Sequence, residues 1–67
     1  MTAVTLMVAT PPYTRWRTRS GILVEERGRC FAGGHRKIAT YRVDTGAWHG
    51  MLRLDRLIKV SDGADAE

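Results

Sequence analysis

Apolar and polar residues alternate along much of the chain, and a period of two residues is typical of β-strands. The alternation is clearest in the middle of the chain, where β-branched and aromatic residues are frequent. Short segments rich in Gly, Pro, Ser or Asp separate the alternating runs. The runs comprise residues 3–9, 14–18, 22–32, 35–43 and 48–54. The sequence therefore predicts an all-β protein.

Three of the separating segments have the composition of tight turns. Gly33-Gly34 fits a two-residue hairpin, because both central positions of a type I′ turn require positive φ. Thr45-Gly46 fits a second two-residue turn. Arg19-Ser20-Gly21 fits a three-residue turn that ends in a bulge. Together they predict a four-stranded antiparallel meander between residues 14 and 54.

The three turns are predicted from separate segments of the sequence, yet together they place the apolar residues on one face of the sheet. They pair Trp16 with Val24 and Val43 with Trp48, and Gly28 indicates a bulge or bend within its strand. A slip of one residue would exchange the two faces, so the agreement supports this register. The predicted apolar face comprises Trp16, Val24, Cys30, Ala39, Tyr41, Val43, Trp48, Leu52 and Leu54.

The chain after residue 50 allows two interpretations. A single 3-10 turn near residues 55–57 with a strand at residues 58–60 fits, and so does a short helix. In the first interpretation, the segment from Gly50 to Val60 resembles the end of an SH3-like small barrel. The resemblance implies five to six short antiparallel strands, a central meander and a 3-10 turn before the last strand. An OB-like barrel is the alternative, and neither fold by itself implies an activity.

The length of 67 residues allows one domain, which we expect to span residues 1–61, followed by a disordered acidic tail at 62–67. So short a chain buries little apolar surface, and self-association could add stability. The first strand has few charges. Thr5 and Met7 on its neutral side are therefore candidate contacts of a homo-oligomer.

The expected location is the cytoplasm. No apolar run approaches the ~20 residues of a membrane-spanning helix, and no signal peptide is predicted. A single cysteine suits a reducing compartment. The small size and the arginine content suggest a bacterial or mobile-element context.

The net charge is +4, and residues 15–42 hold eight Arg or Lys against two Glu. In the predicted register most of these cations lie opposite the apolar face, where a ladder Arg15–Glu25–Arg42 is expected. Arginine matches phosphate geometry, so the leading hypothesis is a non-enzymatic DNA- or RNA-binding protein of low sequence specificity. The candidate contacts are Arg15, Arg17, Arg27, Arg29, Arg36, Lys37, Arg42 and Arg53.

A protein-interaction role is the main alternative. The basic face could bind an acidic protein surface, or the first strand could add to a partner sheet, as in a small phage- or plasmid-type inhibitor. Phe31 and His35 beside the hairpin turn form a candidate partner-contact tip. A third hypothesis is an aromatic cage for a methylated amine or a peptide. Its candidate walls are Tyr13, Trp16, Tyr41 and Trp48.

No catalytic residue, metal or cofactor is predicted. Cys30 with His35 or His49 lacks a third group to orient the histidine, and the thiol is expected to point inward. Zinc requires three or four ligands, which the chain does not provide at a suitable spacing. The chain also has no phosphate-loop motif.

Overall fold

The computed structural model describes residues 7–64 and contains one antiparallel sheet. Its elements are β1 (Met7–Val8), β2 (Arg15–Arg17), β3 (Leu23–Ala32), β4 (His35–Arg42), β5 (Trp48–Arg53), the 3-10 element η1 (Leu54–Arg56) and β6 (Ile58–Ser61). The strand order is β5-β4-β3-β2-β6. β1 also pairs with β3, at Gly28 and Arg29, farther along β3 than the residues that pair with β2. The all-β prediction is confirmed. After β5 the chain forms a 3-10 turn and a strand, and the alternative of a short helix was wrong.

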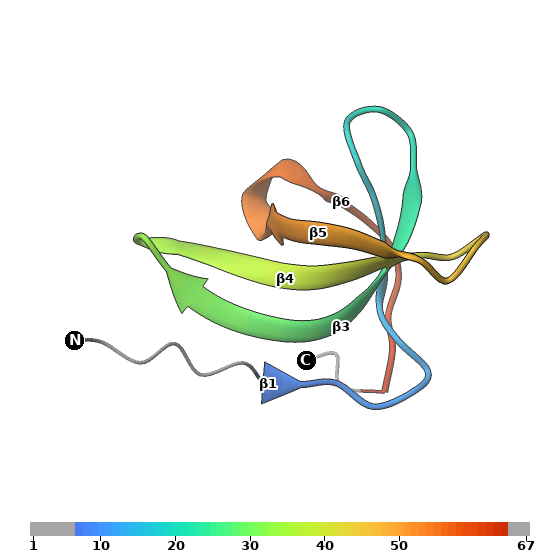
Figure 1. The fold of residues 1–67 in the computed structure, drawn as a ribbon, viewed down its shortest axis with the longest axis horizontal. Coiled ribbons are helices and arrows are strands. Elements are labelled where there is room, and N and C mark those ends of the chain that lie inside the picture. Colours follow the sequence, from blue (N-terminus) through green and yellow to red (C-terminus); the bar gives the residue numbers. More distant parts are fainter. Residues whose placement is uncertain (1–6, 65–67) are drawn as a thin grey trace.

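The sheet is bent but not closed. Figure 1 shows β3 and β4 as a long curved hairpin, with η1 turning the chain back from β5 toward β6. Within residues 7–64, β5 and β6 end the strand order and do not pair with each other. The closed SH3-like barrel is therefore not confirmed. The outer edge of β5 remains unpaired in the described part of the chain.

The two connections before and after β3 match the prediction. Gly33-Gly34 has φ values of 60° and 79°, and Ala32 pairs with His35 across the turn. Trp16 pairs with Val24, as the turn at residues 19–21 predicted. Local turn chemistry was therefore sufficient to define these two pairings.

A bulge immediately before Gly28 shifts the pairing of β3 with β4 by one residue. The glycine indicated this bulge, but the predicted register did not include the shift. Glu25 therefore pairs with Tyr41 and not with Arg42. The pairing of Arg15 with Glu25 is confirmed, but the three-residue ladder was wrong.

The connection between β4 and β5 is longer than the predicted two-residue turn. Arg42 N–H donates to the Ala47 carbonyl at 2.8 Å, and Gly46 N–H donates to the Arg42 carbonyl at 2.9 Å. As a result Tyr41 pairs with Trp48. The longer loop shifts the predicted pairing by two residues, so Trp48 stays on the side of β4 that carries Tyr41. The bulge before Gly28 turns that side away from the core, so the predicted burial of Trp48 was wrong.

The core is formed by Trp16, Val24 and Ile38, with Ile22 and Leu54 partly buried against it. The predicted register had placed Ile38 on the polar face. Trp48 is instead 54% exposed. Ala39 is also buried, as predicted. Five other residues of the predicted apolar face belong neither to this cluster nor to the buried residues, namely Cys30, Tyr41, Val43, Trp48 and Leu52.

We expect Asp44, in the loop between β4 and β5, to titrate near pH 2. Its carboxylate accepts hydrogen bonds from Arg42 Nε at 2.9 Å, from Arg42 Nη2 at 2.7 Å and from the Thr45 N–H at 2.7 Å. The Arg42 hydrogen bonds are the main cause that lowers the pKa of Asp44 from 3.8 to about 2. Because the folded pKa is the lower one, this contribution to stability is complete above about pH 4 and is lost as the pH falls toward 2.

A carboxyl NMR titration measures this pKa. Arg42→Gln should raise the midpoint toward 3.8. Arg36→Gln, near the opposite end of β4, should leave the midpoint unchanged. A wild-type midpoint near 3.8 would contradict the loop geometry.

Candidate functional site

Four of the eight predicted nucleic-acid contacts are paired with nearby carboxylates. Ion pairs at an exposed surface contribute little to stability, but any such pair offsets the charge that a phosphate would meet. The pairs are Arg27–Glu25 at 2.9 Å, Arg42–Asp44 at 2.7 Å, Arg53–Asp55 at 2.7 Å, and Arg29–Glu26. The predicted basic face is therefore less uniform than the sequence indicated.

Arg29 belongs to a structural pair. Its partner Glu26 is only 6% exposed and also accepts a hydrogen bond from Trp16 Nε1 at 2.9 Å. A buried carboxylate needs such partners, because an unpaired buried charge is strongly destabilising. Arg29 therefore compensates a charge at the edge of the core, on the opposite side of the sheet from the one predicted.

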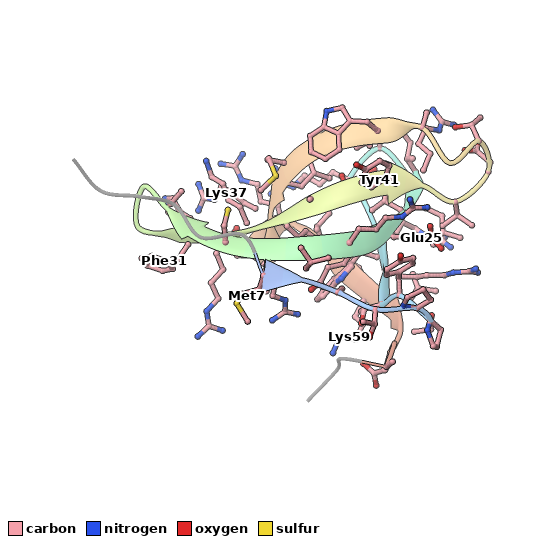
Figure 2. All side chains as sticks on the ribbon, turned by 60° about the horizontal axis from the view of Figure 1, so that its bottom comes forward. Met7, Glu25, Phe31, Lys37, Tyr41 and Lys59 are labelled. Carbon is pink, nitrogen blue, oxygen red and sulfur yellow. The ribbon has the colours of Figure 1, made fainter. Side chains whose placement is uncertain are left out.

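The other predicted residues are spread over the molecule. Arg15 and Arg17 are exposed on β2, next to β6. Phe31, His35 and Arg36 line a hollow of about 460 Å³ at the β3–β4 tip, so the predicted tip residues do lie together. Figure 2 shows Phe31 and Lys37 at one end of the hairpin, and Glu25 and Tyr41 at the other.

The predicted oligomer strand is described only in part. Met7 is 68% exposed on β1 and pairs with Arg29. Thr5 lies outside the described residues.

A groove of about 510 Å³ lies between β5 and the loop that joins β2 to β3. That loop projects from the sheet on the side of β5 (Figure 1). The groove is lined by Thr18, Arg19, Ser20, Lys37, His49, Met51, Leu52, Arg53, Arg56 and Leu57. Four cations and a histidine thus line the groove together with three apolar side chains, those of Met51, Leu52 and Leu57. No carboxylate is among the described lining residues.

Each cation reaches the groove from a different element. Lys37 on β4 pairs with Arg53 on β5, which places both side chains on one face of the sheet. Arg19 lies in a turn closed by the Gly21 N–H, which donates to the Thr18 carbonyl at 2.9 Å. Arg56 ends η1. The fold therefore concentrates positive charge that is dispersed in the sequence.

Arg53 is the only one of these cations with an ion pair in the described part of the chain. Its hydrogen bonds lower the pKa of Asp55, which stays ionised at neutral pH. The carboxylate is exposed, and Asp55, which belongs to η1, lines the separate hollow beside Phe31. Arg53 is thus held in place but remains part of the groove.

The candidate contacts from the sequence did not include Arg19, Arg56 or His49. The first was assigned to a turn and the second to the 3-10 element, so neither had a predicted face. They approach Lys37 only because η1 folds the chain back toward the loop between β2 and β3. No local pattern in the sequence indicates this approach.

The aromatic residues form a stack around Arg27. Its Cζ lies 5.1 Å from the ring centre of Tyr13 and 4.4 Å from that of Tyr41. The ring centre of Tyr41 is 5.3 Å from that of Trp48, with an interplanar angle of 68°. The predicted cage was wrong, because Trp16 belongs to the core and the guanidinium of Arg27 lies over the rings of both tyrosines.

Comparisons of the chain with protein-family models, with curated proteins and with solved structures find no match. Among residues 7–64, no three His, Cys, Asp or Glu side chains gather as a metal site would require. The same residues contain no helix long and apolar enough to cross a membrane. The groove and the aromatic stack are thus the features on which a functional assignment can be based.

Proposed function

We propose that the protein is a non-enzymatic nucleic-acid-binding protein that holds phosphates in the groove between β5 and the β2–β3 loop. The observation that carries this proposal is the convergence of Arg19, Lys37, Arg53 and Arg56 on one groove. Clustered cations in a concave surface raise the local positive potential and attract polyanions. Arginine forks also match phosphate oxygens in geometry.

We further propose that the sheet is an open variant of the SH3-like small barrel. A meander, a 3-10 turn and a closing strand that returns to β2 support this assignment. In this arrangement the groove lies at the opening between β5 and the rest of the sheet. An open edge of this kind leaves room for an extended polymer to lie along β5.

The groove predicts a defined salt dependence. For single strands, log K falls with log salt concentration with a slope of about −0.7 per neutralised phosphate. The double substitution Arg19→Gln/Arg56→Gln should therefore make the slope less negative by about 1.4 and weaken binding about ten-fold or more at low salt. Fluorescence anisotropy with labelled oligonucleotides of about ten residues, as single strands and as duplexes, measures both quantities.

The matched control is Arg15→Gln/Arg17→Gln, which removes the same charge from β2, outside the groove. It should change the affinity much less. Equal losses in the two double variants would show that net charge determines binding and the groove does not. A failure of all oligonucleotides to bind at low salt, with binding of polyglutamate, would favour an acidic protein partner and overturn the proposal.

A further inference from the structure

We propose that the ligand is single-stranded nucleic acid, one base of which stacks on the exposed ring of Trp48. This inference rests on the proposed function and specifies its substrate class. The ring of Trp48 is 54% exposed, yet a series of side-chain contacts holds it in place. Exposed aromatic side chains beside a basic groove are the usual combination in proteins that bind single strands.

The contacts behind Trp48 form a continuous series. Trp48 meets Tyr41 edge to face, and Tyr41 lies on the guanidinium of Arg27. The same guanidinium also lies over the ring of Tyr13, and its Nη2 donates to Glu25 Oε1 at 2.9 Å. Arg27 Nε is buried without a hydrogen-bond partner in the described residues, so the rings and Glu25 hold this side chain.

This series fixes the orientation of Trp48 before any ligand binds. Little rotamer freedom is then left to lose on binding, which favours affinity. An edge-to-face aromatic pair also leaves one ring face open to a further planar group. Trp48 thus has the geometry of a preorganised stacking platform.

A bulge places Trp48 on the same face of β5 as Met51 and Arg53, two residues that line the groove. In a regular strand, residues three positions apart, such as 48 and 51, point to opposite faces. Here the register shifts between Trp48 and Gly50, so that Trp48 pairs with Tyr41 while Met51 pairs with Ala39. Trp48 and Met51 therefore share one face, and Met51 lines the groove.

Two cations of the groove, Lys37 and Arg53, lie at the other end of this face. Lys37, paired with Arg53, is four residues along β4 from Tyr41, a separation of about 13 Å at the usual rise of a strand. A few nucleotides can bridge this distance, with phosphates near Lys37 and Arg53 and a base on Trp48. Figure 2 shows Lys37 and Tyr41 at these two positions.

The stacking platform distinguishes single strands from duplexes. In a duplex the faces of the bases are covered by their neighbours, so a side chain at the surface cannot stack on them without unpairing. Bases of a single strand are accessible and stack on aromatic rings with little dependence on sequence. Phosphate contacts alone would not discriminate between the two forms.

Tryptophan fluorescence and affinity test this inference together. Oligothymidylate of about ten residues should quench the wild-type emission, and Trp48→Phe should abolish most of the quenching, because the remaining Trp16 is buried. Trp48→Ala should weaken single-strand binding about five-fold or more with an unchanged salt slope. A duplex of the same length should bind more weakly and quench less.

Phe31→Ala is the matched control. Phe31 is also an exposed aromatic residue, at 67%, but it lies at the opposite end of the hairpin from Tyr41 (Figure 2). This substitution should leave both affinity and quenching unchanged. Circular dichroism of each variant establishes that the fold is retained.

Different experimental outcomes would contradict base stacking on Trp48 and nucleic-acid binding in the groove. If single strands and duplexes bind equally and Trp48→Ala has no effect, base stacking is excluded while the basic groove stands. If the Trp48→Ala loss is matched by Phe31→Ala, the platform is also excluded. If no oligonucleotide binds at low salt, the nucleic-acid assignment itself fails.

Discussion

Trp16→Ala is expected to unfold most of the protein in the absence of denaturant. Trp16 is 7% exposed and packs against Val24 and Ile38, and its indole N–H donates to Glu26. Truncating a buried tryptophan costs about 3–5 kcal/mol. A core of this size rarely provides more than about that amount in total. Far-UV circular dichroism in a urea titration measures the loss, and Trp16→Phe provides a milder variant that should stay folded.

Trp48→Ala is the matched control for this first prediction. It removes the same side-chain type from β5, where the ring is half exposed and meets Tyr41 alone among the described aromatic residues. The expected cost is about 1–2 kcal/mol, from one aromatic pair and partial burial. A larger loss from Trp48→Ala than from Trp16→Ala would show that Trp48 belongs to the core and that the register of β5 is wrong.

Glu26→Ala is expected to destabilise the protein by about 1–3 kcal/mol, since it removes the acceptor of the buried Trp16 indole N–H and the buried partner of the half-exposed Arg29. Glu26 Oε1 accepts hydrogen bonds from Trp16 Nε1 at 2.9 Å and from Arg29 Nη2 at 3.2 Å. Without the carboxylate, the buried indole N–H loses its acceptor and Arg29 loses this ion pair. Urea unfolding followed by circular dichroism measures the change. Glu26→Gln keeps one acceptor for Trp16 and should fall between the wild type and Glu26→Ala.

Asp55→Ala provides the comparison with an exposed ion pair. It removes a carboxylate that binds Arg53 at the surface, where solvent screens the charges, and its cost should be much smaller. Equal costs for Glu26→Ala and Asp55→Ala would show that the Glu26 pair is not buried. In a binding experiment, Arg29 variants are expected to lose activity through instability, so they do not report on phosphate contacts.

Local residue chemistry determined much of the strand layout. The alternation of apolar residues defined an all-β chain, and Gly33-Gly34 defined the β3–β4 hairpin with its pairing at the tip. The turn at residues 19–21 aligned Trp16 with Val24. These features depend on neighbours in the sequence, which is why they could be predicted. Lys37 and Arg53 were likewise candidate contacts before the groove was known.

The faces of β4 and β5 were decided by the tertiary structure. One additional residue in a bulge or loop exchanges the two sides of a strand, because side chains alternate with a period of two. The bulge before Gly28 adds such a shift between β3 and β4, and a second bulge adds one in β5 between Trp48 and Gly50. The first turned the side of β4 that carries Ile38 toward the core, and the side that carries Tyr41, with Trp48 opposite it, away from the core. The alternation alone cannot locate these shifts, since either register pairs apolar residues with one another.

The composition of the chain determined that it is basic, but only the tertiary structure decided where its charge can act. Arg27 and Arg42 are offset by carboxylates only two residues away in the sequence, whereas the groove joins charges that are remote in the sequence. The return of η1 brings Arg56 to the same groove as Arg19, although 37 positions separate them in the sequence. Electrostatic potential depends on distances between charges, and those distances are set by the packing of strands that are remote in sequence.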